Sequence, residues 1–486
     1  MKKANSNDES HVHWRRTKII ATLGPSSDSQ EIITKLVDAG VNVFRLNMSH
    51  GSNDERLILV DRIKKVTKRL NKQVAILVDL CGPKIRVGKL VSGKINLKEN
   101  ELITITCGKA GKVDEKIISQ YKGLYKDVKK GDRIFLDDGK LELVVRSINK
   151  KDVICKVKYG GELSDNKGMN LPDTEITAES YTEKDKQDTE FAIGINADFI
   201  ALSFVKDKKD ILKLKKHLRS QHNEIPVIAK IERKEAISNI KEIINESYGL
   251  MVARGDLGIE LPAQEVPLIQ RDLIKLSRKY NRPVIVATQM LESMISNSQP
   301  TRAEVGDVAN AALSSVDAVM LSAETASGNF PVKSVEMMDS ILREIEAYQI
   351  KHNCFSDSND MKEINRMTSE REAFSYAVTS LTQSLELEAI IVPTRSGTTA
   401  IALASDRPVS PLVAVCPDIN ICRRLMLHWG VMSFNLEASM AHNWKKMSKD
   451  ITKRCLKGDK GKRILFVSGF NDVMELNEPV IKLVSL

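Results

Sequence analysis

Three charged residues lie beside two apolar runs in the middle of the chain. The runs cover 226–231 and 249–253, and the helical pattern between them predicts one βαβ unit. Lys230 and Glu232 would point to the same side of the first strand, because side chains alternate along a strand. Asp256 would arrive from the end of the next parallel strand. Two carboxylates there predict a site for a divalent cation such as Mg²⁺, and the lysine suits an anionic substrate such as a phosphoryl group. The alternative is an ion pair that caps a sheet, since charges at strand ends are common in α/β proteins.

A second set of polar residues ends another apolar run. Arg45, Asn47 and Ser49 alternate in sequence, so they would share one face at the end of their strand. Strand-like runs of this kind occur eight times, and a helical pattern follows each one. They cover 17–22, 41–46, 74–78, 198–204, 226–231, 249–253, 284–288 and 318–321. This alternation predicts an α/β fold built on a (βα)₈ TIM barrel, in which functional residues lie at the C-terminal ends of the strands.

The alternation is interrupted once, after the third strand. Short β-like runs then lie between glycine, lysine and aspartate turns, and Asp137-Asp138-Gly139 indicates a hairpin. A polar stretch over 353–367 indicates a linker, and a second α/β pattern follows it. We therefore expect four parts. They are an N-terminal arm (1–16), the barrel (17–81 and 181–350), an inserted β-barrel lid domain (82–180) and a C-terminal three-layer α/β domain (351–486).

Composition narrows the possible classes of protein. Charged residues at 28% and hydrophobic residues at 42% fit a soluble globular protein, and no apolar run approaches the roughly 20 residues of a membrane span. The N-terminal stretch lacks the apolar segment of a secretory signal, and the seven cysteines form no C-x-x-C pair. We therefore expect a cytoplasmic protein with reduced thiols and no membrane partner. The net charge of +10 could indicate nucleic-acid binding, but the lysines are spread along the chain and aromatic residues are only 5%, so anionic metabolites explain the charge as well.

Seven longer motifs stand in one order along the chain. They read ATLGPSS, FRLNMSHG, IAKIER, ARGDLG, ATQMLESM, PTRAEVGDVANA and SAETASG. In these motifs and in its arrangement of domains the chain resembles the pyruvate kinases over nearly its full length. The resemblance implies transfer of a phosphoryl group from phosphoenolpyruvate to ADP, giving pyruvate and ATP in glycolysis. It also implies Mg²⁺ or Mn²⁺ as cofactor and a homotetramer.

The resemblance assigns roles to the residues at the strand ends. Lys230 would stabilise the phosphoryl group in flight, which suits an ammonium facing charge spread over three oxygens. Glu232 and Asp256 would bind the divalent ion, and Arg45 would contact the phosphoryl group. Gly255 would contact phosphoenolpyruvate, and Thr288 would lie near the carbon that is protonated. The residues that would contact the nucleotide are Thr22, Pro25, Asn47 and His50 of the barrel and Arg86 and Lys167 of the lid.

One segment departs from the family pattern. The common form reads Asp-Thr-Lys-Gly-Pro-Glu-Ile-Arg, whereas residues 79–86 read Asp-Leu-Cys-Gly-Pro-Lys-Ile-Arg. Leu80 removes a hydroxyl ligand of the monovalent cation, and Lys84 places an ammonium where the family has a carboxylate. A tethered ammonium can supply the charge that K⁺ otherwise supplies and would repel K⁺ nearby. This resembles the K⁺-independent branch, so we expect activity without K⁺, with Asn47, Ser49 and Asp79 holding no cation. In the alternative, Lys84 points to solvent and K⁺ still binds.

A polar loop in the C-terminal domain is typical of an anion site. It reads TRSGTT between a strand and a helix, and backbone amides at a helix N-terminus attract phosphate. In the family this loop holds a phosphate of an allosteric effector, and Trp444 would align with a tryptophan of the effector site. The later effector loop is shortened over 468–473, so the choice between a sugar phosphate and a nucleotide stays open, as does a helix cap without a ligand. The effector residues are Thr394, Arg395, Ser396, Gly397, Thr398 and Thr399.

Three other functions remain as alternatives. A non-catalytic barrel could bind nucleotide or sugar phosphate and signal through assembly, although the intact set of catalytic residues argues against it. A different barrel enzyme could act on phosphoenolpyruvate or pyruvate without ADP, although Arg86 and Lys167 favour a nucleotide. A nucleic-acid-binding protein is the third, and it requires binding that falls steeply with salt.

Overall fold

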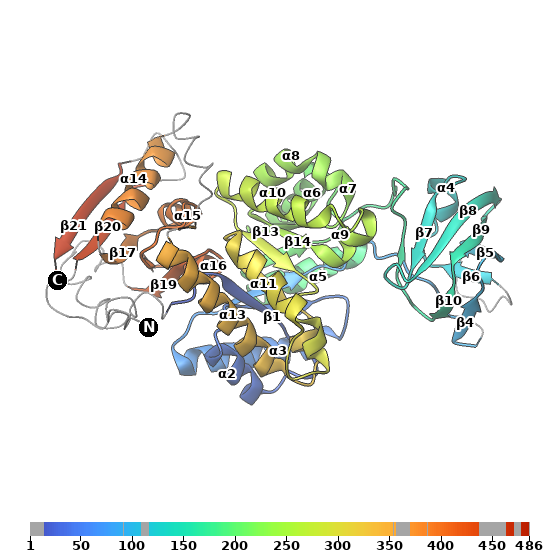
Figure 1. Ribbon diagram of the computed structural model, residues 1–486, viewed down its shortest axis with the longest axis horizontal. Coiled ribbons are helices and arrows are strands. Elements are labelled where there is room, and N and C mark those ends of the chain that lie inside the picture. The colour runs from blue at the N-terminus through green and yellow to red at the C-terminus, as the bar shows by residue number, and fades with distance from the viewer. Residues whose placement is uncertain are drawn as a thin grey trace.

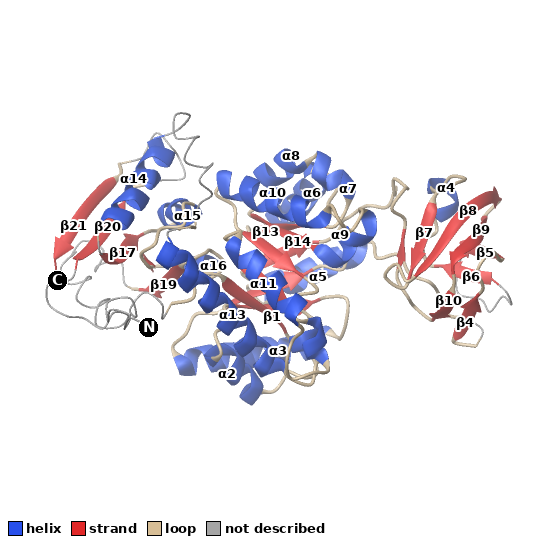
Figure 2. Cartoon of the chain, viewed as in Figure 1, coloured by secondary structure: helices blue, strands red, loops and turns tan. Residues whose placement is uncertain are grey.

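Three bodies of secondary structure make up the protein: a barrel, an all-β domain on one side of it and an α/β domain on the other (Figure 1). The computed structural model describes residues 14–90, 92–107, 116–352, 354–355, 370–385, 387–436, 463–470 and 478–485. Helices surround the central strands, whereas the domain at the right of Figure 2 consists almost entirely of strands. Among the described residues, no helix has the length and apolar character needed to cross a membrane.

The central body is a closed barrel of eight parallel strands, as the alternation predicts. In barrel order the strands are β1 (Lys18–Thr22), β2 (Val43–Asn47), β3 (Ala75–Asp79), β12 (Phe199–Leu202), β13 (Val227–Ile231), β14 (Gly249–Ala253), β15 (Val284–Ala287) and β16 (Ala318–Leu321). The helices are α2 (Gln30–Asp38), α3 (Asn53–Leu70), α5 (Glu183–Gly194), α6 (Lys208–Ser220), α7 (Lys234–Ser238), α8 (Ile240–Glu246), α9 (Arg254–Glu260), α10 (Val266–Lys279), η1 (Glu292–Ile295), α11 (Arg302–Leu313), α12 (Ala323–Ala326) and α13 (Pro331–His352).

Local sequence explains where the outer helices begin. Ser52 and Glu55 form a reciprocal capping box at the start of α3, and Thr301 and Glu304 form another at the start of α11. The helical pattern predicted between β13 and β14 is wrong as a single helix, because it divides into α7 and α8 at Asn239. The Asn239 side chain donates to Lys206 O at 3.0 Å, so it contacts a neighbouring loop at the point where the helix is interrupted.

The strand ends also differ from the prediction at three places. Asp256 was expected at a strand end, but it lies in the first turn of α9, which begins directly after β14. Ser203 and Phe204 lie beyond the end of β12, and Phe204 has a φ of 54°. Thr288 follows β15 with a φ of 69°. A threonine or phenylalanine at positive φ is strained, and such residues are common at functional sites.

The inserted domain is built from strands and one short helix. Its elements are β4 (Lys94–Leu97), β5 (Leu102–Cys107), β6 (Lys116–Ser119), α4 (Leu124–Asp127), β7 (Arg133–Leu136), β8 (Leu141–Asn149), β9 (Asp152–Tyr159), β10 (Gly161–Ser164) and β11 (Met169–Asn170). They form a six-stranded sheet in the order β11-β7-β8-β9-β5-β6 and a two-stranded sheet of β10 and β4. The predicted turn joins β7 to β8, and Asp137, Asp138 and Gly139 all have positive φ, as tight hairpin turns require. We call this domain the lid.

The C-terminal domain has a five-stranded sheet in the order β19-β18-β17-β20-β21, in which only β21 is antiparallel to its neighbour. Its elements are α14 (Glu370–Ser384), β17 (Leu387–Pro393), α15 (Thr398–Ser405), β18 (Leu412–Cys416), α16 (Ile419–Leu425), β19 (Val431–Asn435), β20 (Arg463–Ser468) and β21 (Val480–Ser485). Leu427, which follows α16, packs with the inward-facing side chains of the barrel. The C-terminal domain therefore closes the end of the barrel opposite the strand ends that carry the polar residues.

The expected N-terminal arm is described only from Trp14 onward. Arg15 forms an ion pair with Asp339 at 2.7 Å, and the backbone N–H of Arg16 donates to Glu346 of α13 at 2.7 Å. The Arg16 guanidinium reaches Val409 O of the C-terminal domain at 2.6 Å. These three residues are therefore packed between barrel and C-terminal domain. Trp444 and residues 471–473 lie outside the described residues.

Candidate active site

Lys230 stands at the centre of a cluster of charges at the C-terminal end of the barrel. Its Nζ lies 2.9 Å from Glu232 Oε1 and 3.2 Å from Asp79 Oδ1, and it donates to Ser203 Oγ at 2.7 Å. Lys230 and Glu232 share one side of the end of β13, as strand alternation predicts. Glu232 Oε2 in turn accepts the backbone N–H of Phe204 at 2.7 Å.

Arg45 reaches the same cluster from β2. Its Nε donates to Asp79 Oδ2 at 2.7 Å, and its Nη1 donates to Thr22 Oγ1 at 3.1 Å. Asp79 is only 1% exposed and lies between two cations, Arg45 and Lys230. Residues from β1, β2, β3 and β13 thus meet at one edge of the barrel.

Burial and pairing fix the protonation of this cluster. Burial alone would raise the pKa of Asp79, but Lys230 and Arg45 outweigh it and hold the pKa below its ordinary value. Burial alone would lower the pKa of Lys230, but Asp79 and Glu232 raise it well above the ordinary value. Lys230 therefore carries a positive charge across the neutral pH range, which the role predicted for it toward a phosphoryl group requires.

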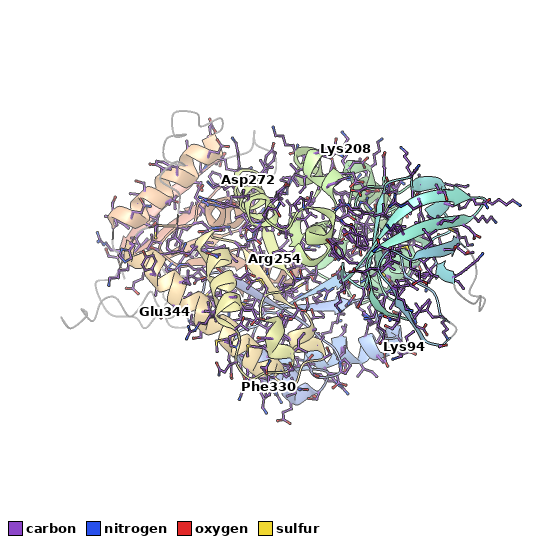
Figure 3. All side chains as sticks on the ribbon, turned by 45° about the vertical axis from the view of Figure 1, so that its right-hand side comes forward. Lys94, Lys208, Arg254, Asp272, Phe330 and Glu344 are labelled. Atoms are coloured by element: carbon purple, nitrogen blue, oxygen red, sulfur yellow. The ribbon has the colours of Figure 1, made fainter. Side chains whose placement is uncertain are left out.

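The first turn of α9 is held against Thr288. The Gly255 N–H donates to Thr288 Oγ1 at 2.8 Å, and that hydroxyl also contacts Ala287 O at 2.5 Å. Arg254, labelled in Figure 3, donates to Thr288 O at 2.7 Å and forms an ion pair with Asp307 at 2.6 Å. Sequence reasoning missed these contacts of Arg254. They hold Gly255, Asp256 and Thr288 in one arrangement.

The predicted barrel residues surround a cavity of about 860 Å³. Its size fits a small-molecule substrate with a nucleotide, and its walls combine apolar side chains with a few convergent charges. Of the predicted residues, those that line it are Thr22, Pro25, Arg45, Asn47, Ser49, His50, Asp79, Lys84, Lys230, Glu232, Asp256 and Thr288.

Comparison with known proteins identifies the family. Residues 14–335 match the family described as "Pyruvate kinase, barrel domain", and residues 372–476 match "Pyruvate kinase, alpha/beta domain". The chain is 44% identical to the pyruvate kinase of Staphylococcus saprophyticus over 420 residues, which cover 86% of this chain and 71% of that protein. The chain belongs to the pyruvate kinase family.

Further relatives agree with this assignment. The chain is 44% identical over 419 residues to the pyruvate kinase of Staphylococcus aureus strain MRSA252, with the same coverage of 86% and 71%. It is also similar to the crystal structure of a pyruvate kinase from Cryptosporidium parvum. That similarity has a TM-score of 0.89 and 32% identity, and it covers 98% of this chain and 97% of the other. The protein is therefore a phosphotransferase with the fold and reaction of pyruvate kinases.

In this chain, the residues expected at the monovalent-cation position of the family have protein partners. Asn47 Oδ1 accepts the Ser49 N–H at 3.1 Å, and both oxygens of Asp79 face Arg45 or Lys230. Leu80, 1% exposed, presents no oxygen from its side chain. Lys84 is exposed and lines the cavity, and it makes no ion pair among the described residues. Its charge acts on the same region, since burial and then Lys84 lower the pKa of His50.

The two lid residues expected at the nucleotide do not line the cavity. Arg86 pairs with Gly168 in an isolated β-bridge, which places it beside Lys167, and its Nη1 donates to Asn166 O at 2.8 Å. Lys167 forms an ion pair with Asp137 at 2.8 Å. The lid therefore carries both cations side by side, outside the lining of the cavity, and after burial and Lys84 the charge of Arg86 still contributes to lowering the pKa of His50 in the barrel.

The predicted effector loop forms a tight turn before α15. Thr394 Oγ1 accepts the Gly397 N–H at 2.9 Å, and Gly397 has a φ of 92°. Ser396 and Thr398 join their hydroxyls at 2.8 Å. Thr399, in contrast, is buried, and its hydroxyl points to Phe470 O, 3.5 Å away, and not to solvent.

Ser203 is the residue of this site that sequence reasoning missed. It accepts a hydrogen bond from Lys230 and donates to Leu80 O at 2.7 Å. A polar residue directly after the apolar run 199–202 was a usable signal, because strand ends carry the functional residues of barrels. The positive φ of Phe204 had no signal in the sequence.

Proposed function

We propose that the cavity transfers the phosphoryl group of phosphoenolpyruvate to ADP without needing K⁺. The carrying observation is the pair of fixed cations, Lys230 and Arg45, held by Asp79 at the barrel end, with the ammonium of Lys84 at the same cavity. Phosphoryl transfer leaves little covalent chemistry for a protein, so positioning and charge stabilisation account for most of the rate. Preorganised cations of this kind supply both.

In the proposed reaction, an oxygen of the ADP β-phosphate attacks phosphorus in line with the bond to the enol oxygen. The new phosphorus–oxygen bond forms as the bond to the enol oxygen breaks, and the electron pair of that bond stays on the enolate. Lys230 and Arg45 face the charge on the phosphoryl oxygens, and Asp79 and Glu232 hold the pKa of Lys230 above its ordinary value, so the lysine enters the reaction protonated. The enolate carbon then takes a proton to give pyruvate. Water near the Thr288 hydroxyl is the proposed donor, since Thr288 lines the cavity.

Glu232 and Asp256 fit a divalent cation as hard oxygen ligands. Both line the cavity; burial raises the pKa of Glu232, Lys230 opposes that shift, and the negative charge of Asp256 adds to it. A cation shared by the two carboxylates would relieve that repulsion. Among the described residues no group of three or more such side chains gathers, which agrees with Mg²⁺ or Mn²⁺ taking its other ligands from substrate and water. When bound, the ion would neutralise phosphoryl and enolate oxygens.

The proposed K⁺ independence is tested by initial rates in tetramethylammonium chloride and in KCl at equal ionic strength. We expect rates within about twofold of each other, because Lys84 supplies the positive charge and Asn47 and Asp79 already have protein partners. The matched variant is Leu80→Thr with Lys84→Glu, which restores the hydroxyl and carboxylate of the common form. It should lose activity in tetramethylammonium and regain it in KCl. More than about tenfold stimulation of the unchanged protein by K⁺ would refute the proposal.

Three further features complete the proposed function. The lid would bring Arg86 and Lys167 to the phosphates of ADP and exclude water when it closes. The loop from Thr394 to Thr399 would bind the phosphate of an activating sugar phosphate or nucleotide at the start of α15. The family relationship supports a homotetramer in the cytoplasm, with no nucleic-acid or membrane partner.

A further inference from the structure

The lid is joined to the barrel by two connections that run beside each other. The outgoing connection leaves β3 through Leu80, Cys81 and Gly82, and the returning one reaches α5 through Ser180 and Thr182. Any rotation of the lid must pass through these two connections. The residues that fix them to the barrel therefore determine where the lid carries Arg86 and Lys167.

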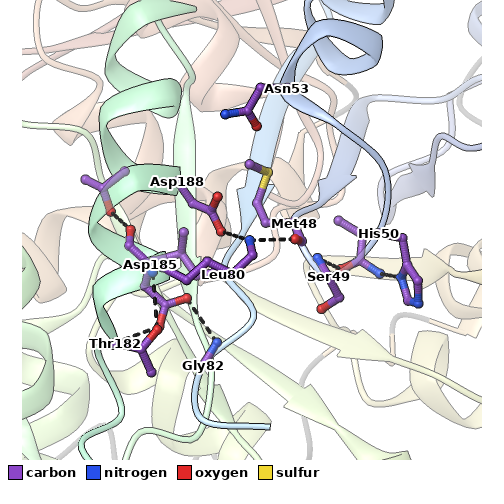
Figure 4. Close-up of polar contacts among 12 residues, drawn as sticks. Met48, Ser49, His50, Asn53, Leu80, Gly82, Thr182, Asp185 and Asp188 are labelled. Carbon is purple, nitrogen blue, oxygen red and sulfur yellow. Dashed lines mark hydrogen bonds and ion pairs between the residues drawn. The ribbon is translucent and has the colours of Figure 1, made fainter. Parts of the chain in front are cut away.

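A single carboxylate binds both connections. Asp185, the third residue of α5, is completely buried (0% exposed). Its Oδ1 accepts the Gly82 N–H at 3.0 Å, while its Oδ2 accepts the Thr182 N–H at 2.8 Å and the Thr182 hydroxyl at 2.6 Å. Figure 4 shows Asp185 between these two residues. Among the described residues no cation pairs with Asp185, so amide and hydroxyl hydrogens balance its charge.

This arrangement exceeds what a helix cap requires. In the described part of the chain, the capping-box carboxylate of α3, Glu55, is exposed and bonds only to Ser52 within its own turn. That of α11, Glu304, also accepts from Ser293, but within the same barrel segment. Asp185 makes the same contact to Thr182 and adds one to Gly82, which is 103 residues earlier in the chain. The capping residue of α5 thus also joins the two connections between the lid and the barrel, which we call the hinge.

Gly82 can lie at this junction only as a glycine. It has a φ of 65°, and a Cβ there would come within 2.9 Å of Phe204 and 3.0 Å of Ser203. Ser203 and Phe204 form the turn after β12, and both hinge connections contact this turn. Ser203 donates to Leu80 O at 2.7 Å, and Ser180 donates to Phe204 O at 2.7 Å.

The same turn contacts the residues proposed to face the phosphoryl group. Ser203 Oγ accepts from Lys230, and the Phe204 N–H donates to Glu232. On its other side, α5 reaches the loop after β2, because Lys184 donates to Met48 O at 2.9 Å. Met48 lies between Asn47 and Ser49, which both line the cavity, and Figure 4 shows it beside Ser49 and His50. A hinge fixed at Asp185 is therefore fixed relative to the site itself.

We propose that Asp185 is a positioning residue that holds both hinge connections together, so that the lid delivers Arg86 and Lys167 to the nucleotide phosphates in one defined orientation. This inference rests on the proposed role of the lid in binding ADP. Its specific consequence is a loss of ADP recognition when the tie to Gly82 is broken. Phosphoenolpyruvate recognition, which the proposal places on barrel residues, should change little.

Two variants distinguish the contact between Asp185 and Gly82 from the helix cap that Asp185 forms with Thr182. Asp185→Glu keeps a carboxylate of the kind that Glu55 and Glu304 supply in the other two capping boxes, but its extra methylene moves the group away from Gly82. Thr182→Val removes the capping hydroxyl and leaves the contact between Asp185 and Gly82. The first variant tests the hinge, and the second controls for a weakened helix start.

The experiment measures kcat and both KM values of the full-length protein, with amide hydrogen exchange at residues 80–82. For Asp185→Glu we expect the KM for ADP to rise about tenfold or more, since a hydrogen bond to a charged group is lost, and exchange at the hinge to quicken by a similar factor. The KM for phosphoenolpyruvate should stay within about twofold. Thr182→Val should change neither the KM values nor the exchange at 80–82 by more than about twofold.

Two results would overturn the proposal: unchanged exchange at residues 80–82 in Asp185→Glu, or equal effects of the two variants on the KM for ADP. Arg86→Ala tests the proposed function separately. An unchanged KM for ADP in that variant refutes the nucleotide role of the lid, and amide exchange at the hinge then still decides whether Asp185 holds the two connections.

Discussion

At the scale of single residues, the site depends on which charges face each other when no substrate is bound. Asp79 is buried between Arg45 and Lys230, and Glu232 lies against Lys230 on its other side. These pairs hold the two cations in fixed positions. In the proposed reaction little rearrangement would then be needed during transfer, and preorganised charges of this kind have a large electrostatic effect on a transition state.

Replacing Lys230 with methionine should remove turnover while preserving binding. The methionine keeps much of the side-chain volume but removes the positive charge that we propose faces the phosphoryl oxygens. We expect kcat to fall at least about 10²–10³-fold, which is the usual effect of losing one preorganised donor. Phosphoenolpyruvate binding, measured by intrinsic fluorescence or calorimetry, should remain detectable because Arg45 is unchanged. Lys72→Met, at a surface ion pair with Asp38, is the matched control, and an active Lys230→Met protein would contradict the assigned role.

Single residues also show how far the sequence predicts this site. Strand alternation places Lys230 beside Glu232, and the strand-end rule brings Arg45 and Asp79 to the same edge. The sequence does not reveal that Arg254 holds Thr288, because that contact depends on how α9 turns after β14. Nor could it show that the cap of α5 reaches back to Gly82. Such contacts join segments whose relative position only the folded barrel defines.

At the scale of elements, segments with a clear apolar pattern are predicted well, whatever their length, and the more polar strands of the lid are not. Strands β14 and β16 have the predicted bounds, and the sequence pattern also predicts α11 over 302–313, β5 over 102–107 and β7 over 133–136, as the structure has them. The lid strands β4, β6, β10 and β11 are absent from the prediction, because none of them contains three apolar residues in a row, as β7 and β16 do. Their pairing comes from neighbouring strands and from the shared core of the lid.

The loop before α15 gives a prediction at this scale. Ser396 is exposed, whereas Thr399 is buried and directed at Phe470 O, so an acidic residue at 396 adds charge to the loop without disturbing the core. We expect Ser396→Asp to abolish activation by a panel of sugar phosphates and nucleotides, because a carboxylate repels a phosphate at the N-terminus of α15. Activity without effector should be unchanged.

Initial rates against phosphoenolpyruvate, with and without each effector, measure this effect. Ser396→Ala is the control, since it removes the hydroxyl without adding charge and should weaken activation less than the aspartate. Activation of the aspartate variant equal to that of the original protein would place the effector at another site.

At the scale of the whole molecule, the C-terminal domain is attached to the barrel through buried polar contacts. Arg407 pairs with Asp317 at 2.9 Å, and Asp317 also accepts the Trp429 N–H at 3.1 Å. His428 lies 2.7 Å from the Tyr248 hydroxyl and is 2% exposed. The two domains thus share a polar junction at the end of the barrel that the C-terminal domain covers. An unpaired charge at this junction would weaken the contact between the two domains.

His428 makes this junction sensitive to acid. Burial lowers its pKa to about 4, against an ordinary value of 6.5, so the unfolded chain binds a proton at a higher pH than the folded one does. The groups that face it are Tyr248, Asp317, Arg407, Lys18 and Arg282. Asp317 favours the protonated form, whereas the three cations oppose it together with burial. The stabilising effect of a neutral His428 is therefore complete above about pH 6.5 and declines as the pH falls towards 4.

The expected decline is about 1.4 kcal/mol per pH unit across that window, since one proton is taken up on unfolding. His428→Gln keeps a polar partner for Tyr248 but cannot take up the proton, so its unfolding free energy should fall less steeply with acid. The measurement is the midpoint of urea unfolding for both proteins between pH 4 and pH 7, followed by tryptophan fluorescence, because Trp429 lies beside the junction. The two curves should converge as the pH falls. Parallel curves would show that the proton is taken up elsewhere and that His428 does not set the acid stability of the domain junction.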